Sequence, residues 1–129
     1  FWLISPHLNL KKAKQPLFTF AHAQKYAGTP ISDNLQIHVS TNFEGNRAAA
    51  TWTEVTDKLV NADDATASAW PDGSSWDFLN AQLDLSAFAG HDNVVVAFRY
   101  ISVGKDEEAG IAGTAATWEL KNVVCREAE

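Results

Sequence analysis

Apolar and polar residues alternate over short stretches of this chain. Between Leu35 and Ser40 every second residue is apolar, the three being Leu35, Ile37 and Val39. A period of two is typical of a β-strand with one buried face and one wet face. The stretch from Val94 to Val103 is instead apolar at nearly every position. It predicts a central strand that is covered on both faces.

Further strands are expected wherever apolar runs are separated by turn-forming residues. These runs are Phe1 to Ile4, Leu17 to Ala23, Thr51 to Thr56, and Thr117 to Cys125, the last with a bulge after Leu120. Only the ranges 62–69 and 84–89 could form a helical turn. Short strands joined by long polar loops predict an all-β fold, a two-sheet antiparallel jelly-roll sandwich, with residues 1–129 as one domain.

Composition and charge narrow the classes of function. The 129 residues are 46% hydrophobic, which is enough for one core, and no apolar run is long enough to span a membrane. A formal net charge of −6 argues against a nucleic-acid partner. The one basic cluster, Lys11-Lys12-Ala13-Lys14, is typical of a solvated hairpin tip.

The single cysteine, Cys125, excludes an internal disulfide and lies in an apolar run, as a small core residue does. The sequence opens directly into an apolar stretch at Phe1, without a targeting signal. We therefore expect the chain to be part of a longer protein.

Five segments, taken in order, resemble a known family. They are Trp2-Leu3-Ile4-Ser5-Pro6, Ala50-Thr51-Trp52-Thr53-Glu54-Val55, Leu83-Asp84-Leu85-Ser86-Ala87-Phe88-Ala89-Gly90, Val96-Ala97-Phe98-Arg99-Tyr100 and Ala116-Thr117-Trp118-Glu119-Leu120. Together they resemble the choice-of-anchor J and cleaved-adhesin domains of Bacteroidetes-type secreted proteins. The resemblance implies a galactose-binding-like or MAM-like jelly roll, extracellular or attached to the cell surface, that serves in adhesion or binds a polymer; it does not imply an enzyme activity. Such domains usually begin with one more strand, so the resemblance also implies that the first strand is missing here.

Calcium is the candidate cofactor, since similar jelly rolls often hold one structural ion on loop oxygens. The candidate ligands are Asp84, Asp92 and Asn93, with Asp63 and Asp64 as further possibilities. However, the resemblance places an aspartate of the last strand where this chain has Lys121, and a cation at that position opposes a metal.

Sugar binding is the candidate activity, because sugars stack on exposed aromatic rings. Trp70 and Trp76 flank a loop without an obvious strand to bury them, and Asp72 offers a hydrogen-bond acceptor between them. The alternative is that a loop tryptophan folds back as a lid on the sandwich.

Arg99 interrupts an apolar strand and must be paired or face a groove. We expect either an ion pair with Glu119 or Glu54, or a contact to a ligand.

Three functions are compatible with these observations. The first is a non-catalytic module that binds a glycan or a host or matrix surface component. The second is a structural accessory domain packed against a neighbouring domain, such as a hydrolase, of the same chain. The third is a small hydrolase, although no zinc motif, nucleophile elbow or phosphate-binding glycine motif is present in the sequence.

Overall fold

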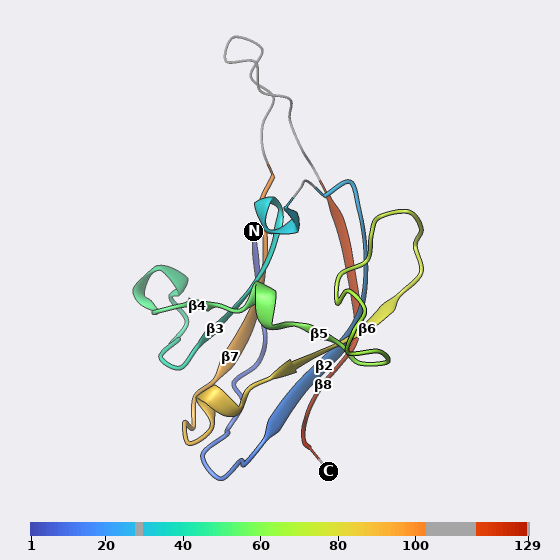
Figure 1. Ribbon diagram of the computed structural model, residues 1–129. Helices are drawn as coiled ribbons and strands as arrows, with labels where there is room; N and C mark the ends of the chain where they lie inside the picture. The colour runs from blue at the N-terminus through green and yellow to red at the C-terminus, as the bar shows by residue number, and fades with distance from the viewer. Residues whose placement is uncertain (28–29, 103–115, 129) are drawn as a thin grey trace.

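The computed structural model describes residues 1–27, 30–102 and 116–128 of the chain. These residues form two four-stranded antiparallel sheets packed face to face, and they contain no α-helix (Figure 1). No helix in this part of the chain could cross a membrane. The predicted all-β, two-sheet antiparallel sandwich is therefore confirmed.

The first sheet has the strand order β1-β7-β3-β4. Its strands are β1 (Trp2–Ile4), β7 (Val95–Tyr100), β3 (Leu35–Ser40) and β4 (Thr53–Glu54). The alternation at 35–40 gives a strand with those bounds. The apolar run from Val94 gives β7, which is covered on both faces as predicted, because Val95 and Val96 are both fully buried. Val103, the expected end of that strand, lies outside the described residues.

The second sheet has the order β5-β6-β2-β8. Its strands are β5 (Val60–Asn61), β6 (Leu79–Asp84), β2 (Pro16–Lys25) and β8 (Thr117–Glu127). The pairing of β2 with β8 shifts between Thr19 and Ala21, and Asn122 has a left-handed φ of 57°. An asparagine tolerates this conformation better than most residues. The predicted bulge in the last strand is thus confirmed.

Connections between strands differ from the prediction in two places. Lys11 and Lys12 are exposed at a turn, but they join β1 to β2, which belong to different sheets, so the turn is not a hairpin tip. The range 62–69 contains turns and no helix, whereas the range 84–89 contains the short 3-10 helix Ser86–Phe88. Chain segments cross between the sheets repeatedly, as in a jelly roll.

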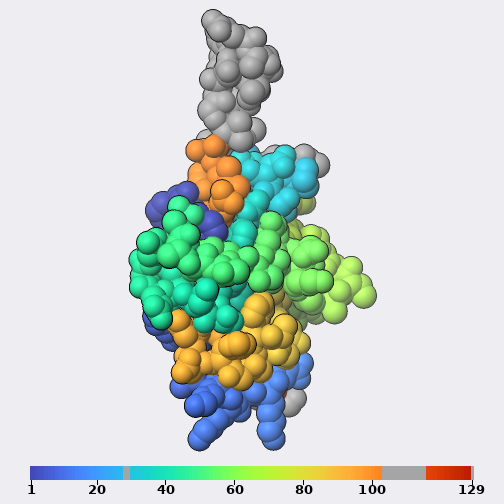
Figure 2. Space-filling view, turned by 90° about the vertical axis from the view of Figure 1, so that its left-hand side faces the viewer, coloured from blue at the N-terminus to red at the C-terminus, as the bar shows by residue number. Residues whose placement is uncertain are grey.

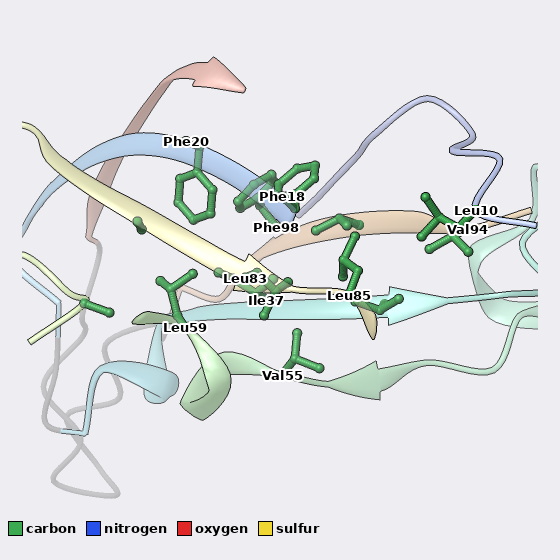
Figure 3. Close-up of a cluster of buried hydrophobic side chains, with 14 residues drawn as sticks. Leu10, Phe18, Phe20, Ile37, Val55, Leu59, Leu83, Leu85, Val94 and Phe98 are labelled. Atoms are coloured by element: carbon green, nitrogen blue, oxygen red, sulfur yellow. The ribbon is translucent and has the colours of Figure 1, made fainter. Parts of the chain in front are cut away.

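Apolar side chains from both sheets meet between them (Figure 3). Phe18 and Phe20 of β2 point inward beside Phe98 of β7, with ring centroids 6.1 and 5.2 Å from it. Ile37 and Leu83 complete the centre and are at most 1% exposed. This layer is the usual core of a sandwich, where alternate residues of each strand fill the space between the sheets.

One inward position of β2 is a histidine, His22, which is fully buried. Its Nδ1 accepts a hydrogen bond from the indole N–H of Trp118 at 3.1 Å. The proton therefore resides on Nε2, which donates to the carbonyl oxygen of Ala69 at 2.8 Å. Burial lowers the pKa of His22 to about 4, partly opposed by the bond to Ala69. The neutral ring thus joins β2, β8 and the loop that precedes β6.

This burial predicts an acid-dependent loss of stability. In the unfolded chain His22 titrates near its ordinary pKa of 6.5, whereas in the folded chain it titrates near 4. As the pH falls from about 6.5 to about 4, only the unfolded chain gains a proton, so the free energy of unfolding should fall by roughly 3 kcal/mol. Urea unfolding at a series of pH values measures this change.

The control replaces histidines one at a time. His22→Leu should remove most of the slope between these pH values, although it lowers stability at every pH. Replacing the exposed His91 by leucine should leave the slope unchanged. Equal slopes in the wild type and His22→Leu would contradict the assignment of a neutral buried histidine.

Candidate functional site

Trp70, Trp76 and Asp72 lie in the loop that runs from Trp70 to Phe78, the second half of the connection between β5 and β6. This loop stands out from the body of the molecule (yellow-green in Figures 1 and 2). It begins at Trp70, whose ring centroid lies 5.1 Å from that of His22 and 5.6 Å from that of Trp118. The ring of Trp70 is half-buried. Trp70 therefore folds back onto the sandwich as a lid, which is the alternative to an exposed sugar-binding ring.

Short-range hydrogen bonds shape the rest of the loop. Asp72 accepts from the backbone N–H and the hydroxyl of Ser74, at 2.9 and 2.6 Å. Gly73 between them has a φ of 83°, and a Cβ there would lie 3.3 Å from the side chain of Gln24. Gln24 in turn donates to the carbonyl oxygen of Pro71 at 2.5 Å. The turn therefore needs glycine for both its backbone conformation and its close approach to β2.

A cleft of about 530 Å³ opens between this loop and the preceding turn; we call it the loop cleft. Its lining combines aromatic rings with hydroxyl and carboxylate groups, and its residues are Asn61, Asp63, Asp64, Ala67, Ser68, Trp70, Pro71, Asp72, Ser74, Ser75, Asp77, Phe78 and Leu79. Hydroxyl donors lower the pKa of two of these carboxyl groups, Thr66 acting on Asp64 and Ser74 acting on Asp72. Both are therefore ionised acceptors at neutral pH.

Two exposed rings accompany the cleft. Trp76 is 43% exposed and Phe78 is 37% exposed. The ammonium group of Lys25 lies 5.2 Å from the Trp76 ring, and that of Lys121 lies 4.1 Å from the Phe78 ring. Phe78 was not among the predicted site residues. Its signal in the sequence is the pattern Trp76-Asp77-Phe78, two aromatic residues separated by a carboxylate, directly before β6.

Arg99 does not line the loop cleft. It lies on β7, where it neighbours Trp2 of β1 and Gln36 of β3 in register. Its guanidinium carbon is 5.2 Å from the centroid of the Trp2 ring, and it donates to Gln36 at 3.5 Å. Within the described residues Arg99 forms no ion pair with a carboxylate, so the expected ion pair with Glu119 or Glu54 is not present.

The Trp2 ring belongs to an aromatic layer on the outer face of the first sheet. It lies 4.9 Å from the ring of His38 and 5.1 Å from that of Trp52, and Arg47 approaches it from another side at 5.1 Å. Figure 2 shows the segment around Trp52, teal to green, across this side of the molecule. Burial lowers the pKa of His38. This layer covers β7 and β3, so we assign it a structural role.

The predicted calcium ligands do not form a cluster. Among the described residues, no three His, Cys, Asp or Glu side chains are placed to hold one ion. Asp84 is engaged locally, since it accepts from the backbone N–H of Ser86 at 2.9 Å and from its hydroxyl. The Ser86 hydroxyl lowers the pKa of Asp84. Asn93 donates to the carbonyl oxygen of Phe43 at 3.0 Å, and Asp92 is exposed in the same turn.

The molecule is thus an antiparallel β-sandwich with an aromatic and acidic cleft at one loop. The chain belongs to the family described as Domain of unknown function (DUF5017), whose model matches residues 9–127. No curated protein matches the sequence.

The contacts of Asp84 predict a structural role that does not depend on calcium. Asp84→Ala removes the acceptor of the Ser86 turn and should lower the free energy of unfolding by about 1 kcal/mol. Asp84→Asn, which keeps an oxygen acceptor, should lose less. Thermal melts of all three proteins, each in excess calcium and in chelator, measure both effects.

The melting temperature of each protein should be the same in the two solutions. A bound ion would instead stabilise the wild type by about 2.7 kcal/mol at a hundredfold excess over Kd. A rise in the wild type that Asp84→Ala abolishes would restore the calcium interpretation.

Proposed function

We propose that this domain is a non-catalytic module that binds a neutral glycan in the loop cleft. The observation that carries this proposal is the cleft's combination of aromatic rings and ionised acceptors in a space of about 530 Å³. Small-ligand sites are commonly concave, with aromatic walls and a few polar groups that fix orientation. A sugar presents both an apolar face for a ring and hydroxyl donors for carboxylates.

The charge of the cleft favours a neutral ligand. Asp63, Asp64, Asp72 and Asp77 all line it, and the whole chain has a net charge of −6. Like charges oppose an anionic polymer, both at the site and during approach. Neutral hydroxyls, in contrast, can donate to these oxygens.

Two features support binding without catalysis. A glycosidase needs a carboxylic acid that stays protonated near neutral pH, beside a second carboxylate. The shifted pKa values of Asp64 and Asp72 are instead lowered by their hydroxyl donors. Neither histidine with a lowered pKa lines this cleft: His22 lies in the core behind Trp70, and His38 lies in the aromatic layer of the first sheet.

The resemblance to cleaved-adhesin domains supports an extracellular or cell-surface location for such a module. It also supports an attachment to other domains of the same protein. A purely structural accessory domain is the second candidate, and the observation that favours it is the exposed apolar edge formed by Phe1 and Leu3, which are 82% and 51% exposed.

Binding of the wild type to an array of neutral and acidic glycans tests the proposal. We expect retention on neutral glycans, and at least about tenfold weaker binding after Phe78→Ala, the loss of roughly 1.4 kcal/mol. Trp76 belongs to the same loop but does not line the cleft. Trp70→Ala is not suitable, since Trp70 also supports the core.

The matched control is Trp52→Ala, which removes a half-buried tryptophan from the outer face of the other sheet. It should leave glycan binding unchanged once its fold is verified by circular dichroism. Binding that is equally weakened by Trp52→Ala, or untouched by Phe78→Ala, would place the ligand elsewhere. No retention on any glycan would favour the accessory-domain alternative.

A further inference from the structure

The strand β8 is a long edge with one free side. It spans eleven residues, Thr117–Glu127, and pairs with β2 on one side only. On its other side no strand of the described residues adjoins it. The backbone N–H and C=O groups of such an edge can pair with another strand.

The interior of the sandwich is also uncovered along this edge. Leu3 of β1 is in register with Phe98, whose side chain belongs to the core, so Leu3 faces the same way. Nevertheless Leu3 is 51% exposed, and Phe1, two residues earlier, is 82% exposed. Apolar side chains that face a core yet remain in water indicate a missing neighbour.

Two clefts follow the same edge. One, of about 300 Å³, is lined by Phe1, Leu3, Phe98, Tyr100, Ala116, Thr117, Trp118 and Leu120. The other, of about 530 Å³, is lined by Leu8, Asn9, Leu10, Lys11, Lys12, Ala13, Pro16, Cys125, Arg126 and Glu127. Each has one wall from β8 and another from the first thirteen residues. A single added strand beside β8 would therefore run past both.

We propose that this strand is β8 of a second copy, paired antiparallel about a twofold axis to give a continuous eight-stranded sheet. In the register that pairs Trp118 with the partner's Glu127, facing residues lie on the same side of the sheet, and Glu119 lies opposite the partner's Arg126. This register also places Leu120 opposite the partner's Cys125. By symmetry each pairing occurs twice.

Charge complementarity selects this partner and this register. Glu119 and Arg126 are both exposed, and the contact of the Arg126 guanidinium is with the carbonyl oxygen of its neighbour Glu127, at 3.5 Å. Opposite charges on facing strands stabilise pairing, whereas like charges oppose it. Lys121 faces the partner's Val124, so no like charges lie directly opposite each other in this register.

The two faces of the strand also match across the axis. Leu120 and Cys125 both pack against the core, so they would cover the apolar edge of the partner. The bulge occurs near Asn122, and in this register it meets the bulge of the partner. Because both copies of β8 carry their extra residue at the same place, residues that lie opposite each other share one side of the sheet both before and after the bulge.

Sedimentation equilibrium from about 1 to 200 µM at moderate salt tests the proposal. We expect a concentration-dependent mass that reaches twice the 14.1 kDa of the chain. Arg126→Glu places like charges opposite each other twice and should raise the dimer Kd at least about tenfold. The double variant Glu119→Arg, Arg126→Glu should restore dimerisation.

The matched control is Lys58→Glu, which makes the same change of charge at an exposed site in the first half of the chain. It should leave the dimer Kd within about twofold. Circular dichroism and thermal melts verify that each variant folds, so a loss of dimer is separate from a loss of structure.

Three results would overturn the proposal. The first is a monomer at every concentration, and the second is a dimer that Arg126→Glu leaves intact. The third is a failure of the charge-swapped double variant to recover. Hydrogen exchange then identifies another occupant: protected β8 amides in a monomeric, longer form of the protein would show that a strand of its own chain takes the edge. None of these results bears on glycan binding in the loop cleft.

Discussion

The fold depends on how one strand fills the space between the two sheets. Phe18, Phe20 and His22 project from the same face of β2, in the middle of the second sheet. The two phenylalanines meet Phe98 from the opposite sheet. His22 extends this row with a ring that is apolar on its faces and polar at both nitrogens. His22 can therefore both pack in the core and form a hydrogen bond to the backbone of a loop.

The loop cleft is a consequence of this double role of His22. His22 donates to Ala69 and stacks edge-on against Trp70, so the first residues of the loop are held to the core. From there the chain leaves the sandwich, turns at Gly73 and returns through Phe78 into β6. A rigid start and an anchored turn position aromatic and acidic groups around one hollow. The positions of the aromatic and acidic groups of the loop cleft therefore depend on the hydrogen bond between His22 and Ala69 in the core.

Much of the fold can be predicted from the sequence, because a strand that is buried on one face or on both faces has a recognisable pattern of apolar residues. The alternation from Leu35 gave β3, and the apolar run gave β7. The same rule was available for β6, where Leu79, Ala81 and Leu83 alternate, but β6 was not recognised. The candidate site is harder to predict from the sequence. Whether Trp70 faces solvent or core depends on His22, and the partner of Arg99 is Trp2; both neighbours are distant in the sequence.

The edges of the two sheets are very unequal in length. β4 and β5 have two residues each and β1 has three, whereas β8 has eleven. A short edge offers too few backbone groups to template a further strand. Among the described residues, one sheet edge, β8, is therefore long enough for another sheet to pair with it. Once that edge is occupied the assembly is closed, and the architecture resists elongation into fibres.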